Sequence, residues 1–345
     1  MAQIDSDARI RKLSVDDLHD EHCKAFAQAL RNVLSSDTAQ LTFGQIVDGL
    51  PIASVESDHL KGSVVDVYHP VHTKHTELCA GVLDRLQKIW KEHDIKSLRF
   101  DSTLVHAYNS TPPGSRAFQT RLIEMIAVTV HQIGVQLFQS EINFHQNDGL
   151  MNWVYPEDSD FWHDHETMPP TLFVHPQYCD YNQYPEGVAD GVGYWAESRI
   201  LGGVVLFDRR APYTSLSPSN ILGIDPNAIY FHSDGMHVTY RIYQLLEKQR
   251  QDLLQFLLSD ITPPTECPIP IHGTRENLNR VDPEEPIIDT GVYRDLWERK
   301  GLGPDDVDPR TGDVCQNLDY PTYDEFWEAK KRAAYRRRKF EEETS

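Results

Sequence analysis

The N-terminal half of the chain places apolar residues three or four positions apart, which is the spacing of helices that pack on one side. Ser14, followed by Asp16 and Asp17, is typical of a helix N-cap with acidic residues in the first turn. We therefore predict a helix after Ser14 and a second one from about His75 to His93. Their apolar positions are Leu18, Phe26, Leu30, Val33 and Leu34 in the first, and Leu78, Val82, Leu86, Ile89 and Trp90 in the second.

A third helix is predicted from Phe118 to Phe138, and it is apolar around most of its circumference. Its apolar residues include Leu122, Ile123, Ile126, Val130, Ile133 and Leu137. Because such a helix leaves no face for solvent, we expect it at the centre of the core. His131 lies within it and is interpreted as a core histidine with its hydrogen bonds satisfied.

Residues 140–197 follow neither the helical nor the strand period and are rich in Trp, Tyr, Pro, His and Asp. Long irregular stretches are uncommon in compact domains and are often functional. The aromatic content argues against disorder. We therefore expect a functional site in this segment.

A small sheet is predicted after it. The continuous apolar run from Ile200 to Phe207 is typical of a buried strand, and shorter strands are predicted over 228–232 and 238–242. A helix follows over 245–258. Prolines and charges become frequent after residue 262, so 263–345 is predicted to be an arm that wraps the body and ends in a helix from about Tyr323.

These elements define the expected fold class as α+β. A helical N-terminal half packs on a small mixed or antiparallel sheet, within one main domain over 1–262. The Pro-rich segment 263–345 is not expected to be an independent domain. Length alone fits one large domain or two ordinary ones among 345 residues.

Charge narrows the expected partners. A formal net charge of -20 repels phosphate backbones and anionic membrane surfaces, so we expect no nucleic-acid and no membrane partner. A basic run over 330–339 is interpreted as a solvated helix, with a nuclear-import or RNA-contacting patch as the alternative. A small-molecule substrate, neutral or cationic, remains compatible with this charge.

The cysteines and the hydropathy indicate the compartment. The five cysteines are scattered and never form a C-x-x-C pair, which suits a reducing compartment and excludes a cysteine-rich zinc site. No secretory leader and no membrane-length apolar run is visible. We expect a soluble, cytoplasmic protein; its oligomeric state is not determined by these features.

His163 and His165 form an H-x-H pair that places both imidazoles on the same side of an extended segment, as a metal requires. Glu166 or a distant residue could complete a three-ligand site. The alternative is a polar loop in which the histidines bond to Asp160 and Asp164.

His232 and Asp234 have the spacing of two adjacent ligands in a non-haem iron facial triad. The distal ligand would be His272, and Arg275 or Arg280 could hold a co-substrate carboxylate. A long amphipathic helix separates the pair from His272, which disfavours this interpretation. The alternative is a turn at Asp234–Gly235 that reverses the chain between two strands.

A third histidine group offers a zinc site, because His72, His75 and Cys79 could share one helix face. Pro70 marks a helix start, however, and a polar helix N-terminus explains the same residues.

Glu197 is predicted to lie buried beside Arg199, as an internal ion pair or as a general acid or base. The Rossmann, P-loop and nucleophile-elbow fingerprints are all absent.

The stretches 175–210, 230–246 (YFHSDGMHVTYRIYQLL) and 279–300 resemble an uncharacterised family of filamentous-fungal proteins. The resemblance implies a fungal source and a link with specialised (secondary) metabolite biosynthesis. The family has no activity attached to it, so no catalytic residue transfers.

Two functions from different classes are expected. The first is a soluble enzyme that acts on a small organic molecule, with a divalent metal as the possible cofactor. Its metal ligands would be His163, His165 and His232, and its candidate catalytic residues are His163, His165, Glu197, His232, Asp234 and Arg241. The second is a non-catalytic scaffold or interaction protein.

Overall fold

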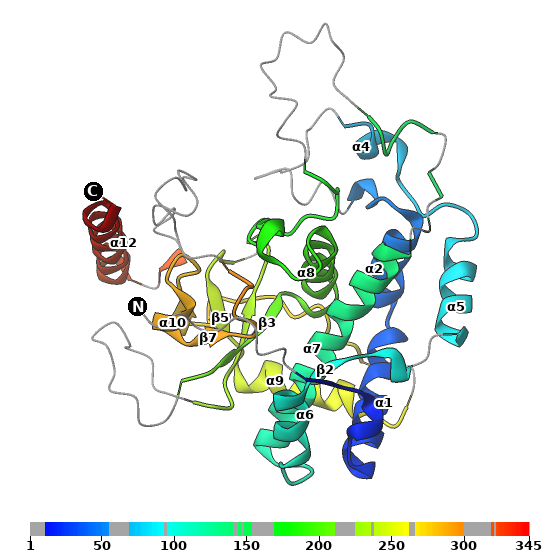
Figure 1. Cartoon of the computed structure of the whole chain (residues 1–345), viewed down its shortest axis with the longest axis horizontal. Coiled ribbons are helices and arrows are strands. Elements are labelled where there is room, and N and C mark those ends of the chain that lie inside the picture. The colour runs from blue at the N-terminus through cyan, green and yellow to red at the C-terminus, as the bar shows by residue number, and fades with distance from the viewer. Residues whose placement is uncertain are drawn as a thin grey trace, which may run out of the picture.

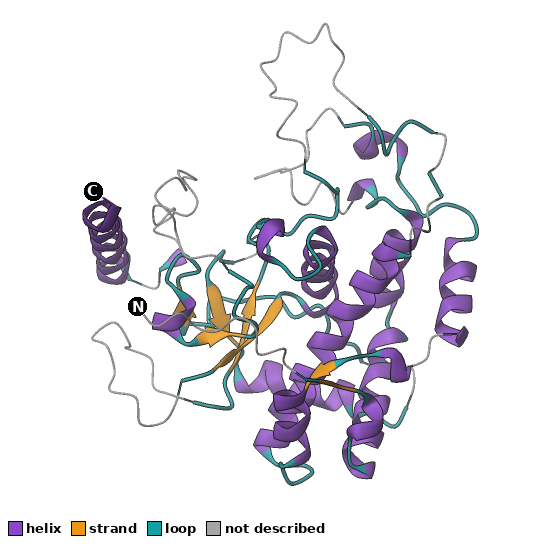
Figure 2. Ribbon diagram, in the orientation of Figure 1, coloured by secondary structure: helices purple, strands orange, loops and turns teal. Residues whose placement is uncertain are grey.

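The computed structural model places most helices on one side of a small sheet (Figures 1 and 2). It describes residues 11–54, 69–92, 95–140, 142, 144–145, 148–153, 169–210, 225–235, 238–261, 266–299, 319–320 and 322–344. In Figure 1 the helices of the N-terminal half lie on the right, and the sheet lies to their left.

Serine caps begin several helices of this half. Ser14, Ser36 and Ser115 each accept a bond from a backbone N–H in the first turn, as N-cap residues do. The capped segments are the 3-10 turn Val15–Asp17, α2 (Asp37–Asp48) and α7 (Arg116–Gln139). Also in this half are α1 (Asp20–Leu34), α4 (Val71–Lys74), α5 (Val82–Glu92), a 3-10 turn (Ile95–Ser97) and α6 (Ser102–Asn109).

The helix predicted from His75 to His93 is shorter than expected: it is α5 (Val82–Glu92), and α4 lies before the predicted start. α4 ends at Lys74, and α5 begins at Val82. Gly81 adopts φ 89 between them, a left-handed conformation that interrupts a helix. The turn leaves His75 and Cys79 outside any helix.

The helix predicted from Phe118 to Phe138 is confirmed as α7, which packs on α1, α2, α6 and α8. By length and composition α7 could cross a membrane, but 67% of its most apolar window is buried inside the protein. That burial is what a central helix of a soluble protein shows.

Residues 188–201 form helix α8 (Val188–Leu201), where we predicted an irregular segment followed by a strand. α8 is buried on nearly all sides, so its sequence has no amphipathic pattern. Glycine allows its close approach to α7: a Cβ at Gly193 would lie 2.8 Å from the His131 ring, and one at Gly134 would lie 3.2 Å from the Ala196 Cβ.

Five short antiparallel strands form the main sheet in the order β6-β5-β4-β3-β7. Their bounds are β3 (Val204–Asp208), β4 (Ile229–His232), β5 (Ile242–Gln244), β6 (Arg280–Val281) and β7 (Val292–Tyr293). β1 (Lys12–Leu13) and β2 (Phe100–Asp101) pair separately. With the helical N-terminal half, this sheet confirms the α+β class.

The predicted strands need two corrections. The first strand begins at Val204, because Ile200 and Leu201 end α8. The strand predicted over 238–242 lies at 242–244, and α9 (Glu247–Leu257) follows it. The chain does reverse between β4 and β5, as predicted, and Gly235 has φ 84 in the connection.

The two faces of the sheet belong to different cores. Val205, Phe207, Ile229 and Phe231 join the large core under the helices. The alternate positions contribute to a second core that the aromatic segment 178–194 covers; it contains Tyr178, Tyr184, Tyr194, Val204, Leu206, Tyr230, Ile242, Val281 and Val292. Because successive side chains of a strand point to opposite faces, the sheet separates these two cores.

The segment after residue 262 supplies both edge strands, β6 and β7. It also includes α10 (Ile287–Thr290) and the terminal helix α12 (Tyr323–Thr344), which begins where predicted and stands apart from the other helices in Figure 1. The division at residue 262 stays a prediction.

Candidate metal centre

Four metal-binding side chains from four parts of the chain meet in the protein. Asp48 is the last residue of α2, His75 follows α4, Cys79 lies in the turn before α5, and His145 follows α7. One ligand atom from each lies within 4.8 Å of all the others. Asp48, His75 and His145 are buried, and Cys79 is half-buried.

Three of the distances between these side chains are close to the ligand separations of a tetrahedral zinc site, two of them measured to different oxygens of Asp48. His75 Nε2 lies 3.1 Å from Asp48 Oδ2, and His145 Nε2 lies 3.2 Å from Asp48 Oδ1. Cys79 Sγ lies 3.6 Å from His145 Nε2. Ordinary zinc bond lengths in a tetrahedron place two N or O ligands about 3.3 Å apart, and an S and an N ligand about 3.6 Å apart.

Backbone bonds around Asp48 bring the four segments together. Gly49, with φ 103, ends α2 in a left-handed turn immediately after Asp48. The Phe144 N–H donates to the Asp48 carbonyl at 3.0 Å, which positions the segment of His145. The Cys79 N–H donates to Asp48 Oδ2 at 2.9 Å.

Both imidazoles are oriented by a partner on the ring nitrogen that faces away from the centre. His75 Nδ1 bonds to the Pro51 carbonyl at 2.9 Å, and His145 Nδ1 bonds to an Asp148 carboxylate oxygen. Each Nε2 is therefore directed at the cluster. This arrangement, a carbonyl or carboxylate behind each histidine, is usual for metal-ligating imidazoles.

The electrostatics of the cluster favour a cation. Burial alone would raise the pKa of Asp48, but hydrogen bonds from His75 and Cys79 outweigh it and lower that pKa. Burial likewise opposes the charged form of His75, yet its bond to Asp48 raises its pKa. Burial and the nearby Asp48 carboxylate raise the pKa of the Cys79 thiol to about 11. A divalent ion would convert this thiol to the thiolate that metals bind.

The sequence prediction identified half of this site. His75 and Cys79 are in the cluster, but His72 is not, because α4 ends before Cys79 and the shared helix face does not exist. Asp48 and His145 were missed. His145 lies in the His-rich segment where we expected a site, whereas an Asp at a helix end gives no signal of metal binding.

The predicted histidine pair His163 and His165 lies outside the described residues, so its metal-binding role stays a prediction. His232 ends β4, fully buried, with Nδ1 3.1 Å from the Tyr178 hydroxyl. Among the described residues, the cluster at Asp48 is the one group with three or more possible ligand atoms so close together. His232, Asp234 and His272 therefore do not form the facial triad considered as an alternative.

The side chain of Arg241 contacts the C-terminal segment and not the metal cluster at Asp48. Its Nε donates to Asp282 Oδ1 at 2.6 Å, and its guanidinium lies 4.0 Å from the centre of the Tyr320 ring. It thus fastens the C-terminal segment to β5. Asp234 lies in the turn after β4. None of these partners of Arg241 is another predicted catalytic residue.

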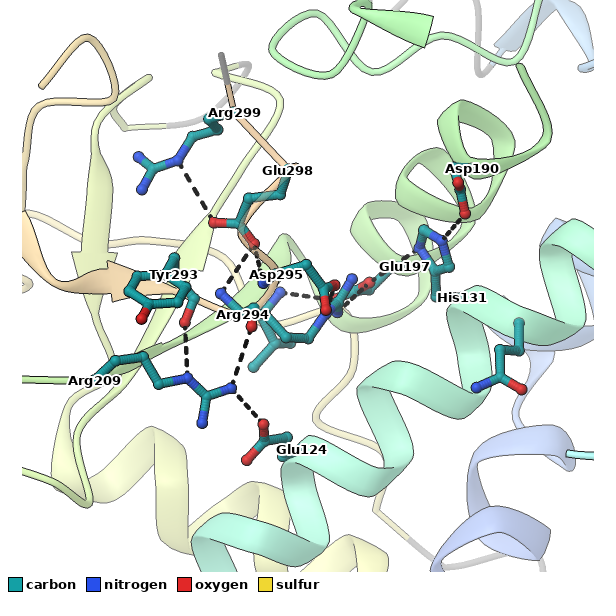
Figure 3. A network of polar contacts seen from close by, with 12 residues as sticks. Glu124, His131, Asp190, Glu197, Arg209, Tyr293, Arg294, Asp295, Glu298 and Arg299 are labelled. Carbon is teal, nitrogen blue, oxygen red and sulfur yellow. Dashed lines mark hydrogen bonds and ion pairs between the residues drawn. The ribbon is translucent and has the colours of Figure 1, made fainter. Parts of the chain in front are cut away.

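Glu197 forms the internal ion pair that we predicted, but with a different partner. It lies on α8, where its two carboxylate oxygens accept from Arg294 Nη1 at 2.7 and 2.8 Å (Figure 3). The Val205 N–H adds a third bond at 2.6 Å. Arg199 is not the partner, because α8 is a helix here and not a strand. Burial opposes the charge of Glu197, but Arg294 and His131 lower its pKa, so it stays ionised.

His131 is the core histidine that we predicted. Its Nε2 lies 2.9 Å from Asp190 Oδ1, and its Nδ1 lies 3.8 Å from Glu197 Oε2 (Figure 3). Burial disfavours its charged form, but the hydrogen bonds to both carboxylates raise its pKa. The network in Figure 3 thus joins α7 and α8 to the segment after β7.

Comparison with known proteins finds no match, whether to a family model, a curated protein sequence or a solved structure. The resemblance to filamentous-fungal proteins stays an expectation.

Proposed function

We propose that this chain is a metalloprotein that binds one divalent transition-metal ion, zinc in the first instance, through Asp48, His75, Cys79 and His145. The observation that supports it is the convergence of four different ligand atoms within 4.8 Å. Two of the ligands are imidazoles already oriented by outer partners.

The mixture of donors selects the metal. Thiolate and imidazole suit zinc, whereas magnesium and calcium prefer all-oxygen sites. One sulfur, two nitrogens and one carboxylate oxygen fill a tetrahedron. With four protein ligands no coordination position remains open for a substrate, which is typical of a structural zinc site.

The proposed role of the metal ion is to hold loops of the protein together. In their described parts, the segment 75–81 and the segment 142–153 contain no helix or strand, and the cluster joins both to the end of α2. A structural metal supplies folding free energy because the site does not exist in the unfolded chain.

The broader expectations remain proposals beside this one. A cytoplasmic location is supported by Cys23, Cys79, Cys179 and Cys267, which form no disulfide within the part of the chain that the structure describes. An enzyme acting on a small organic molecule, in fungal specialised metabolism, would use a site other than the four-ligand centre. A non-catalytic scaffold with a structural metal is the alternative.

Cobalt(II) substitution tests the proposal, because cobalt replaces zinc and absorbs light according to its ligands. We expect cobalt to give the intense visible bands of a tetrahedral site together with a thiolate-to-cobalt charge-transfer band. Cys79→Ser should lose the charge-transfer band, and Cys267→Ser, which changes an exposed cysteine, should keep it.

Weak octahedral bands in the wild-type protein would contradict the proposal. A charge-transfer band that survives in Cys79→Ser would do so as well, since another thiol would then be the ligand.

A further inference from the structure

The cysteine of the candidate metal centre is the most exposed of its four ligands. Asp48, His75 and His145 are 0%, 3% and 5% exposed, whereas Cys79 is only half-buried. Residues 80–81, which follow it in the turn, are exposed. In Figure 1 the connection from α4 to α5, which contains this turn, runs along the outer edge of the molecule. A small molecule from solvent therefore approaches the centre most easily at Cys79.

The four ligands also differ in how they react with an oxidant. Zinc itself has no redox chemistry in proteins. A cysteine is oxidised by peroxide in its thiolate form, which is also the form that metals bind. Among the ligand atoms, Cys79 Sγ is the one sulfur, and it lies 3.6 Å from His145 Nε2. Oxidation of the centre by peroxide is therefore expected to begin at this atom.

No second thiol of the described residues belongs to the centre. Cys23, Cys179 and Cys267 form no disulfide in the described part of the chain, and none of them is in the four-residue cluster. A disulfide requires two sulfurs that come to about 2.05 Å from one another. We therefore expect the first oxidation product of Cys79 to be a sulfenic acid, which a thiol reductant can reverse.

We propose that Cys79 is an oxidation site whose reaction with hydrogen peroxide releases the metal ion. This inference rests on the metal centre of the proposed function. In the reaction, the thiolate sulfur forms a bond to one peroxide oxygen, the O–O bond breaks, and hydroxide leaves. The sulfur is oxidised by two electrons, and the peroxide is reduced by the same two. The product, a sulfenic acid, has lost the thiolate charge that binds zinc.

Loss of this ligand changes what holds the neighbouring loops. Asp48, His75 and His145 remain as ligands, so the ion is held by three side chains in place of four. The turn that contains Cys79 is no longer attached to the metal, and a chelator competes for the ion more easily. A dithiol reverses the change: it supplies two electrons, the sulfenic oxygen leaves as water, and the thiol can bind zinc again.

Zinc release under peroxide tests this inference. Zinc-loaded protein is treated with a small excess of hydrogen peroxide beside a chromophoric chelator too weak to take zinc from untreated protein. Dimedone traps sulfenic acids in a parallel sample, and mass spectrometry locates them. We expect one zinc to be released for each Cys79 oxidised, and dithiothreitol to restore zinc binding in untrapped protein. Cys267→Ser, which removes an exposed thiol outside the cluster, should release zinc at the wild-type rate.

Cys79→Asp is the matched variant, because a carboxylate oxygen can replace the sulfur as a zinc ligand and is not oxidised by peroxide. It should keep its zinc under the treatment that empties the wild type. If this variant does not fold, the ratio of zinc released to Cys79 oxidised in the wild type still decides.

Three results would overturn the inference: zinc that stays bound in the wild type under peroxide, zinc released while Cys79 is unmodified, or equally fast release from Cys79→Asp. A wild-type protein that cannot be loaded with zinc before peroxide is added contradicts the proposed function itself, and the inference with it. The loading step therefore separates the two failures.

Discussion

Glu197 and Arg294 are both buried, and each satisfies the other's charge through Arg294 Nη1. At the scale of single residues this pair determines how the segment after β7 attaches to α8. Removing one partner of a buried ion pair leaves an uncompensated charge, whereas replacing both with neutral groups costs less.

We therefore expect Arg294→Met to lower the free energy of unfolding by about 3–5 kcal/mol. The double variant Arg294→Met/Glu197→Gln should be more stable than Arg294→Met alone, because Gln can still accept from the Val205 N–H. Denaturant unfolding of the two variants and the wild type measures this. A double variant that is no more stable than Arg294→Met would contradict a direct pairing.

Glu298 gives the protein a predictable pH dependence. Burial raises its pKa from 4.5 to about 7, and this effect is larger than the lowering caused by the charge of Arg299. Glu298 has a higher pKa in the folded protein than in the unfolded chain, so its protonated form favours folding. This contribution to stability is complete below the unfolded pKa and is lost as the pH rises through 7. Relative to Glu298→Gln, the unfolding free energy of the wild type should fall by roughly 2–3 kcal/mol between pH 5 and pH 8.

Unfolding curves of both proteins across that pH range provide the test. Parallel pH dependences would show that Glu298 is ionised throughout and has no raised pKa.

The end of α8 shows how one element is positioned by its neighbours. Gly202 has φ 105, and a Cβ there would lie 2.1 Å from the Ile271 carbonyl oxygen. The Ile271 N–H in turn donates to the Leu201 carbonyl at 2.8 Å. The backbone at Ile271 therefore packs directly on the end of α8, and a side chain at Gly202 has no room.

We expect Gly202→Ala to lower the free energy of unfolding by at least about 3 kcal/mol, through backbone strain and overlap together. Gly114 is a matched control, because it has φ 80 but nothing within 4 Å of an added Cβ. Gly114→Ala should cost only about 1 kcal/mol, from the left-handed conformation alone. Equal losses in thermal unfolding would refute the role of the contact.

Elements with a clear period were predictable from the sequence, and those without one were not. α7 and the capped start of the first helical region were identified because local spacing and caps determine them. α8 was missed because full burial removes the amphipathic pattern. The partner of Glu197 was missed for another reason: Arg294 is 97 positions away, and single-sequence periodicity does not report such contacts.

The ligands of the candidate metal site likewise divide into those that are close in sequence and those that are distant. His75 and Cys79 are close in sequence and were considered together. Asp48 and His145 join them only because the end of α2 and the segment after α7 meet in space, as the 3.0 Å bond from Phe144 to Asp48 shows.

At the scale of the whole molecule, the proposed metal joins segments whose described residues around His75, Cys79 and His145 lie outside helices and strands. Zinc bound at about 1,000 times its dissociation constant adds about 4 kcal/mol to stability. We expect a chelator to lower the melting temperature of the zinc-loaded protein by on the order of 5 °C, and added zinc to restore it. His145→Ala should melt at the same temperature with and without chelator.

The zinc stoichiometry of the purified protein tests the central claim most directly. A competition titration against a chromophoric chelator should give one tightly bound zinc per chain for the wild type and for His72→Ala, which changes the nearby histidine outside the cluster. His75→Ala should lose this zinc. Absence of tight zinc binding in the wild type, or its retention in His75→Ala with loss in His72→Ala, would contradict a centre built from Asp48, His75, Cys79 and His145.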